Sequence, residues 1–264
     1  FSIGLFLWAN DGSYYISGNQ LIPMYESNIK VQKEILNIKR INKQQVQVNV
    51  YYEFFNPSEE KTIEVGFEAG APYGDADWTP DKNGRHPYMS DFMLQLNNKI
   101  LPYQVSYVSD SLYYKNGKIQ AKTLKELDTD EEFANFQYVY HFKATFKKGL
   151  NIIQHSYVFD MSSSVYDLYD FYYVLTAANR WANQQIDDFT LIVDMGEFQD
   201  FCINNNFFKP NETQFIINGI GKESKYKFAI EQEFEDYRLS FNHFFIRKGQ
   251  LVLSQKNFKP LSEL

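Results

Sequence analysis

Apolar and polar side chains alternate along residues 44–69 with a period of two, and this stretch constrains the fold more than any other. Every second residue is apolar in residues 46–54, and the alternation resumes in residues 63–67 after a short NPSEE break. A strand with this period has one apolar face and one solvated face. Residues 56–58, Asn-Pro-Ser, are turn formers. The stretch therefore predicts an antiparallel β-hairpin that covers a hydrophobic core on one side.

The same alternation predicts which side chains of this stretch are buried. Even positions of the first strand and odd positions of the second should face the core, because successive side chains of a strand point to opposite faces. The predicted core residues are Val48, Val50, Tyr52, Ile63, Val65 and Phe67, and the predicted exposed residues are Gln47, Asn49 and Glu64.

Other segments also have the patterns of strands joined by turns. The apolar positions of residues 28–39 change parity once, which predicts a β-bulge near residues 32–35. Residues 151–160 are apolar at both parities, so we expect a central strand there. Asn-Gly at residues 116–117 and Lys-Gly at 248–249 predict hairpin turns, and residues 123–133 are the best helical candidate in the first half of the chain.

The whole pattern predicts an all-β protein with the architecture of an antiparallel β-sandwich. Strand candidates recur at a turn spacing typical of sandwiches. We expect one sandwich or two packed sandwich-like subdomains, with one or two short helices. The predicted division places a signal-peptide remnant at residues 1–9, an N-terminal β-sandwich at 10–161 and a C-terminal β-rich region at 162–264 that packs against it.

Residues 1–9, FSIGLFLWA, are almost entirely apolar and are followed directly by Asn10. This is typical of the hydrophobic part of a secretory signal peptide. We therefore expect export to the periplasm or cell surface and a mature N-terminus near Asn10; an N-terminal core strand is the alternative. No apolar run reaches the ~20 residues that a transmembrane helix requires, so we expect no transmembrane segment in the mature chain.

Composition and motifs argue against several classes of function. The net charge is −7, whereas a phosphate-binding surface requires a dense basic patch, so we expect no nucleic-acid partner. The sequence has no Gly-rich phosphate loop, no G-x-S-x-G elbow and no H-E-x-x-H zinc motif. One cysteine and four histidines offer few ligands to a transition metal. We expect no cofactor other than Ca²⁺.

Two single residues could carry chemistry but have simpler explanations. Cys202 lies between Phe201 and Ile203 and is predicted to be a buried small hydrophobic residue rather than a reactive thiol. His155 lies on an apolar parity of its strand. A histidine in that position is expected to be a hydrogen-bonded core residue.

The longest irregular stretch, residues 70–90, is the strongest candidate for ligand recognition. Loops of this length in compact domains are functional or mobile. Aromatic side chains beside carboxylates suit sugars or peptides, and closely spaced carboxylates can bind Ca²⁺; a solvated loop that uses Asp, Asn and Gly only for its turns is the alternative. The predicted ligand-binding residues are Tyr73, Asp75, Asp77, Trp78, Asp81, His86 and Tyr88, and the predicted Ca²⁺ ligands are Asp75, Asp77, Asp81 and Asn83.

Three segments carry a resemblance to a known family: NDGSYY followed by SGNQLIP, VYYEFFNPSEEKTIEVGFEA, and YYVLTAANRWANQQIDDFTLIV. Together they resemble a bacterial extracytoplasmic family of unknown function, whose members in Bacteroidota often carry an additional domain named for a YARHG motif. The likeness spans residues 10–195, and no YARHG string occurs, so we expect that accessory domain to be missing or to have been removed. The resemblance implies export and an all-β fold, and it supplies no catalytic residues.

We therefore expect an exported, non-enzymatic β-sandwich protein with a binding or structural role at the bacterial cell envelope. Its partner would be a glycan, a peptidoglycan fragment or an envelope protein. Two alternatives stay open. One is a carbohydrate-active hydrolase with two carboxylates about 5–9.5 Å apart; the other is a Ca²⁺-dependent glycan-binding or adhesion module.

Overall fold

The chain folds into two packed β-sheets, and the all-β class predicted from the sequence is confirmed. The smaller sheet has the strand order β1 (Gln20–Pro23), β4 (Lys61–Gly70), β10 (Gln137–Phe146), β7 (Gln104–Val108). The larger sheet has the order β15 (Asp200–Asn204), β17 (Glu235–Phe258), β14 (Ile186–Asp194), β2 (Lys30–Arg40), β3 (Gln45–Asn56), β11 (Gly149–Asp160), β5 (Met89–Leu96), β6 (Lys99–Ile100), and β16 (Ile216–Gln232) pairs with β17. The computed structural model describes residues 20–23, 28–72, 76–109, 114–115, 118–127, 136–163, 169–204, 214–232 and 235–260.

Short elements complete this part of the chain. Two small hairpins pair β8 (Tyr114–Lys115) with β9 (Lys118–Ile119) and β12 (Ser162–Ser163) with β13 (Tyr169–Asp170). The one helix among the described residues is the 3-10 helix η1 (Thr176–Arg180), which agrees with the prediction of one or two short helices. No described helix has the length and apolar character to cross a membrane. The predicted signal remnant, residues 1–9, lies outside the described residues.

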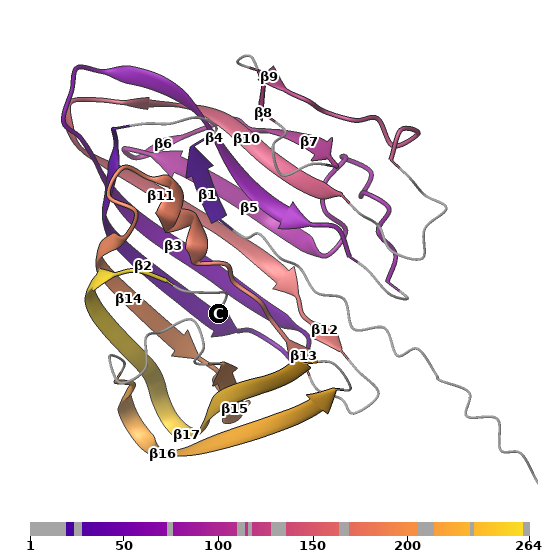
Figure 1. The fold of residues 1–264 in the computed structure, drawn as a ribbon, viewed down its shortest axis with the longest axis vertical. Helices are drawn as coiled ribbons and strands as arrows, with labels where there is room; N and C mark the ends of the chain where they lie inside the picture. Colours follow the sequence, from indigo (N-terminus) through magenta and orange to yellow (C-terminus); the bar gives the residue numbers. More distant parts are fainter. Residues whose placement is uncertain are drawn as a thin grey trace, which may run out of the picture.

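The small sheet covers one end of the large sheet, and the core lies between the two (Figure 1). Phe67 of β4 contacts Phe92 of β5 and Tyr157 of β11, with ring centroids 5.1 and 5.4 Å apart. Phe54 of β3 likewise contacts Phe146 of β10 at 5.6 Å. Edge-on and tilted ring pairs of this kind stabilise a core beyond the area that they bury. Aromatic side chains therefore supply several of the contacts between the two sheets.

The predicted core face of residues 44–69 is confirmed, and the predicted exposure holds only for Asn49. All six predicted core side chains are at most 5% exposed. Asn49 is exposed, and Gln47 and Glu64 are half-buried. Alternation therefore identifies the inner face of both strands correctly.

The prediction that these two strands form a hairpin is wrong. β3 pairs with β2 and β11, whereas β4 pairs with β1 and β10, so the two consecutive strands belong to different sheets. Their apolar faces look toward each other across the core. Alternation shows which face of a strand is buried, but both a hairpin and a crossover between sheets satisfy that requirement.

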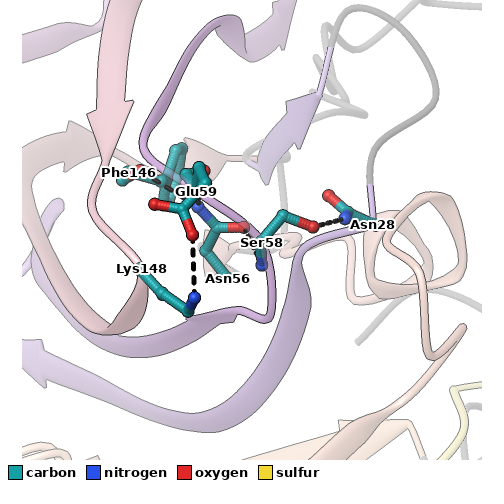
Figure 2. A network of polar contacts seen from close by, with 6 residues as sticks. All are labelled: Asn28, Asn56, Ser58, Glu59, Phe146 and Lys148. Carbon is teal, nitrogen blue, oxygen red and sulfur yellow. Dashed lines mark hydrogen bonds and ion pairs between the residues drawn. The ribbon is translucent and has the colours of Figure 1, made fainter.

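Asn56 closes the turn that carries the chain from β3 to β4 (Figure 2). Its side-chain amide donates to the backbone carbonyls of Glu59 and Phe146 at 3.0 and 3.1 Å, and its Oδ1 accepts from the N–H of Ser58 at 3.1 Å. At the rim, Lys148 pairs with Glu59 at 2.8 Å. Asn56 is fully buried and is the last residue of β3. Its side chain therefore supplies hydrogen bonds to backbone groups at the point where the backbone hydrogen bonds between strands end.

The predicted β-bulge is confirmed at Gln32, where the register of β2 against β3 shifts between Val31 and Lys33. The side-chain amide of Asn183 hydrogen-bonds to the backbone at this bulge. Its Oδ1 accepts from Val31 N–H at 3.1 Å, and its Nδ2 donates to Val31 O at 2.8 Å. Nearby, Trp181 packs on Phe54 with ring centroids 4.5 Å apart. These contacts fasten the segment that contains η1 to the large sheet.

Two further sequence predictions are confirmed. The strand predicted at residues 151–160 is β11, which is central because it lies between β3 and β5. The hairpin predicted around residues 116–117 is the β8–β9 pair, although the two turn residues themselves lie outside the described residues.

Three other predictions are wrong in the described residues. Lys248 and Gly249 do not form a turn, because both lie within the continuous strand β17; Gly249 allows close approach of β16, where a Cβ would meet the backbone of Asn218. Residues 123–127 form a single turn rather than the start of a helix, and the rest of that candidate, residues 128–133, lies outside the described residues. Cys202 is exposed, because its neighbours Phe201 and Ile203 take the inward positions of β15.

One strand pair departs from the expected antiparallel pattern. β14 runs parallel to β2, with Asp188 opposite Lys33, so the large sheet is mixed. The predicted boundary at residue 161 falls just after β11, and strands from both sides of it share this sheet.

Candidate functional site

The two described carboxylates of the predicted binding loop close its turns. Asp77 Oδ1 accepts from the N–H of Thr79 at 2.8 Å, and Asp81 Oδ1 accepts from the N–H groups of Asn83 and Arg85, each at 2.8 Å. The hydrogen bonds from Thr79 lower the pKa of Asp77. Slight burial would raise the pKa of Asp81, but its hydrogen bonds outweigh this and lower it. Both side chains are exposed carboxylates that hold the loop in shape.

Two other loop residues anchor the loop to the sandwich. His86 is 1% exposed, and its Nε2 lies 3.1 Å from the carbonyl oxygen of Gly70, while its N–H donates to the Tyr140 hydroxyl at 3.0 Å. Burial lowers the pKa of His86 to about 3, so the ring is neutral. Trp78 packs edge-on against Phe136 at 5.9 Å.

The remaining predicted loop residues do not form a site in the described part of the chain. Asn83 is exposed, and Tyr88 is half-buried, which raises the pKa of its hydroxyl. Tyr73 and Asp75 lie outside the described residues. No group of three or more His, Cys, Asp or Glu side chains that could hold a metal ion occurs among the described residues. The Ca²⁺ site and the loop-borne ligand site therefore stay predictions.

A concave trough lies on the solvated face of the large sheet, across four neighbouring strands. It encloses about 250 Å³. Small-molecule sites typically enclose ~300–1,000 Å³, so the trough is suited to one unit or one end of a ligand. Its lining residues are Ile35 and Asn37 of β2, Asn49, Val50 and Tyr51 of β3, Met93 and Gln95 of β5, and Gln154, His155 and Ser156 of β11.

The outward-facing lining residues form two rows that run across the strands. The strand registers align Asn37, Asn49, Ser156 and Met93 in the first row, and Ile35, Tyr51, Gln154 and Gln95 in the second. Directly opposite side chains in a sheet lie within about 4.5–5.5 Å at Cβ. The eight side chains therefore make one continuous surface although they come from four strands.

Irregular backbone flanks the trough on both sides. The bulge of β2 lies on one side, and the register of β11 against β5 shifts between Ser156 and Val158 on the other. Asp91 of β5 takes a positive φ of 53° at this shift. Bulges bend a strand and increase its twist, which is how a sheet face becomes concave.

The chemistry of the trough is neutral and rich in hydrogen-bonding groups. None of its lining side chains is a carboxylate, a lysine or an arginine. The amides of Asn37, Asn49, Gln95 and Gln154 can each donate and accept. In the described part of the chain these four amides have no hydrogen-bond partner, so they are available to a ligand. Tyr51 donates to Glu53 Oε1 at 3.0 Å and presents its ring to the trough.

Beneath the trough, the inner face of the same strands carries a buried polar cluster. Glu34 of β2 is 4% exposed and hydrogen-bonds with Tyr52 and Tyr173. Burial raises the pKa of Glu34 to about 8, against which these hydrogen bonds act more weakly. Its Oε1 has no hydrogen-bond partner among the described residues. A void of about 10 Å³, roughly the space of one water molecule, adjoins Glu34 and Tyr52.

His155 extends this cluster along β11. As predicted it is a core residue, 3% exposed, but the prediction that it is hydrogen-bonded is wrong: neither ring nitrogen has a partner among the described residues. The reason is its surroundings, because the ring stacks between Tyr52 and Tyr157 at 5.9 and 6.1 Å and therefore meets aromatic faces. Burial lowers the pKa of His155 to about 3.

Sequence reasoning missed both the trough and the cluster beneath it. Asn49 and Tyr51 were recognisable as the solvated face of a strand, but their neighbours Gln154 and Gln95 join them only through the strand registers. Glu34 gave a clearer signal, because it occupies a position that faces the core in a strand of apolar alternation.

Comparisons with known proteins give a fold and no family. No protein-family model matches the sequence, and no curated protein matches it. Among solved structures, the fold is similar to that of a Legionella pneumophila protein described as a "putative nutrient binding protein". The two are 16% identical, with a TM-score of 0.53, and the match covers 93% of this chain and 72% of that one.

Two other structures share weaker likeness. Baculovirus P35 matches with a TM-score of 0.31 and 14% identity over 88% of this chain and 93% of its own. An M1 zinc metallopeptidase from Deinococcus radiodurans matches with a TM-score of 0.29 and 11% identity, over 86% of this chain and 42% of its own.

Proposed function

We propose that this protein is a binding protein that takes up an uncharged, hydroxyl-rich ligand, a glycan, in the trough of the large sheet. The observation that carries the proposal is the lining itself: eight outward side chains in two aligned rows, all neutral, of which four are amides and one is the hydroxyl of Ser156, in one continuous patch with Tyr51.

The neutral lining selects the chemical class of the ligand. A charged ligand would leave its charge unpaired on a surface without ionised groups, which is unfavourable. Sugar hydroxyls both donate and accept hydrogen bonds, and side-chain amides offer both functions side by side. A row of amides is therefore better matched to a glycan than to a phosphate or a carboxylate.

Tyr51 and Met93 supply the apolar contact that such a ligand also needs. Met93 is 46% exposed and ends the first row, so its side chain is accessible to a ligand. Aromatic and apolar surfaces between polar groups are the common composition of ligand sites. A sugar ring presents an apolar face that can lie on these side chains.

The likeness of fold to the Legionella pneumophila protein described as a putative nutrient binding protein supports a binding role. The apolar start of the sequence and its resemblance to an extracytoplasmic family support a place at the cell envelope. A neutral envelope glycan or a peptidoglycan fragment would meet the protein there.

Titration calorimetry against neutral oligosaccharides and peptidoglycan fragments tests the proposal. Tyr51→Ala should weaken binding at least about tenfold, which corresponds to ~1.4 kcal/mol. Gln154→Ala, as a separate variant, should also weaken glycan binding, because it removes one of the central amides. Ser254→Ala is the matched control, since Ser254 is exposed on β17 beside Thr190, the residue opposite Ile35. Binding that Tyr51→Ala leaves intact, or the absence of any binding glycan, would refute the assignment.

A further inference from the structure

We propose that Ser106, His141 and Glu64 form a nucleophilic triad that hydrolyses small carboxylic esters by acyl transfer through Ser106. The three residues lie on the outer face of the small sheet, on the adjacent strands β7, β10 and β4. This activity is separate from the binding trough, which belongs to the large sheet.

The contacts of the triad are short and continuous. The Oγ of Ser106 lies 3.1 Å from the Nε2 of His141, and the Nδ1 of His141 lies 2.9 Å from Oε1 of Glu64. Both distances are within the reach expected between a nucleophile, its base and the group that orients the base. The acceptor Glu64 makes Nδ1 the protonated nitrogen, so Nε2 carries the lone pair that faces the serine.

Partial burial strengthens this arrangement. The side chains of His141 and Glu64 are only 12% and 16% exposed, and Ser106 is half-buried. An ion pair or charge-assisted hydrogen bond is screened less in such a position than in open water. The serine itself keeps enough exposure to meet a substrate.

A second serine–histidine–carboxylate group in this chain has a different arrangement and shows what distinguishes the triad. Ser224 of β16 lies 3.3 Å from Nδ1 of His243, and the Nε2 of His243 contacts Asp200. The two ring nitrogens are therefore exchanged, and the carboxylate is 67% exposed. In serine hydrolases the carboxylate bonds Nδ1 and the serine faces Nε2, which is the order found around His141.

The reaction follows from these positions. Ser106 Oγ attacks the ester carbonyl carbon, and its proton passes to Nε2 of His141. The tetrahedral intermediate then expels the alkoxide, which takes that proton and leaves as the alcohol. Water attacks the acyl-serine by the same route and releases the carboxylic acid and free serine. Gln104, on the same face of β7 and opposite His141, is placed to donate its amide N–H to the oxyanion.

The surroundings of Ser106 limit the acyl group to a small one. Val139, the cross-strand partner of Ser106, is fully buried in an apolar cluster with Val108 and Ala177. The cluster is filled by the protein's own side chains, so a substrate can touch only its edge. An acetyl group fits this description better than a long acyl chain.

Labelling with a fluorophosphonate probe tests the nucleophile directly. The folded protein should gain one phosphonyl adduct by intact mass, located at Ser106, and Ser106→Ala should abolish it. Ser224→Ala is the matched control and should label like the wild type. Failure of the folded wild-type protein to label, or an adduct that survives Ser106→Ala, would overturn the proposal.

Turnover of p-nitrophenyl acetate tests the other members. His141→Gln should lower the rate about 100-fold or more, because the general base is lost. Glu64 acts only through His141, as a positioning residue, so Glu64→Gln should lower kcat about tenfold or more and leave KM unchanged. Equal turnover by wild type and by Ser106→Ala would overturn the proposal.

A thiol at residue 106 gives a readout that needs no ester. Next to His141, the thiol of the Ser106→Cys variant should react with iodoacetamide readily, and at least about tenfold faster than the same thiol without that histidine. The His141→Gln change in the same variant should remove that advantage. Equal rates at residue 106 with and without the His141→Gln change would contradict a base at His141.

Discussion

The hydroxyl groups of Tyr52 and Tyr173 lie 3.2 Å apart inside the sandwich, although 121 positions separate the two residues in the chain. Glu34 hydrogen-bonds with both and completes a buried cluster. Because burial raises the pKa of Glu34 to about 8, its carboxyl group is mostly protonated at neutral pH. Tyr173, which precedes η1, is thus held to the large sheet by hydrogen bonds with Tyr52 and with the protonated carboxyl group of Glu34.

Glu34→Gln should remove a pH dependence of stability. The pKa of Glu34 is higher in the folded chain than its ordinary 4.5, so its contribution is complete below 4.5 and is lost as the pH rises to about 8. Within that window the wild type should lose up to ~1.4 kcal/mol per pH unit relative to the variant. Urea unfolding at pH 5, 7 and 9 measures this, with Glu60→Gln at an exposed position as control. If the free energy of unfolding changed with pH equally in the wild type and in Glu34→Gln, the raised pKa of Glu34 would be contradicted.

His155→Phe should act in the opposite direction. The folded-state pKa of His155 is about 3, below its ordinary 6.5, so its contribution is present above pH 6.5 and lost as the pH falls toward 3. The phenyl ring keeps the stack between Tyr52 and Tyr157 and removes two unpaired nitrogens. The variant should therefore melt higher than the wild type at pH 4 by several degrees. His86 stays in both proteins, so only their difference reports on residue 155.

Asn56→Ala should destabilise the turn between the two sheets. The change leaves the carbonyl of Phe146 and the N–H of Ser58 without the partner that Asn56 supplies (Figure 2). Lost hydrogen bonds of buried groups cost about 1–3 kcal/mol, which urea unfolding can resolve. Ser58→Ala, at an exposed position of the same turn, should change stability by no more than about 0.5 kcal/mol. Equal effects of the two changes would show that burial of Asn56 is unimportant.

The double change Asp77→Ala with Asp81→Ala tests the loop predicted to bind Ca²⁺. Both side chains are exposed, so removing their turn hydrogen bonds should lower Tm by only a few degrees. If the loop binds the ion, millimolar Ca²⁺ should raise the Tm of the wild type and leave that of the variant unchanged. If Ca²⁺ did not change the Tm of the wild type, the predicted Ca²⁺ site would be ruled out.

The sequence predicts the faces of strands much better than their partners. Burial of Val50 and exposure of Asn49 follow from alternation alone. The same alternation could not separate a hairpin from a crossover, because β3 and β4 bury the same faces in either arrangement. Gly249 was misread for a related reason: a glycine that admits a neighbouring backbone has the same local pattern as one in a turn.

The candidate sites depend on register, which a single sequence does not reveal. Tyr51 and Gln154 are neighbours only because β3 and β11 pair in one particular alignment. Ser106, His141 and Glu64 come from three strands, and a shift of one residue in any of them would turn a side chain to the opposite face. Only local groups such as Asp81 with its own turn could be foreseen from spacing.

The parallel pairing of β2 with β14 makes the order of synthesis matter for this protein. β2 finds β3 as soon as both have been made, but the other edge of β2 keeps free N–H and C=O groups until β14 emerges much later. During that interval a nascent chain offers an open strand to any other chain nearby. Contacts between such distant segments also form slowly. Dilute conditions, or a chaperone that holds this edge, should therefore decide how much of the newly made protein reaches its closed sheet.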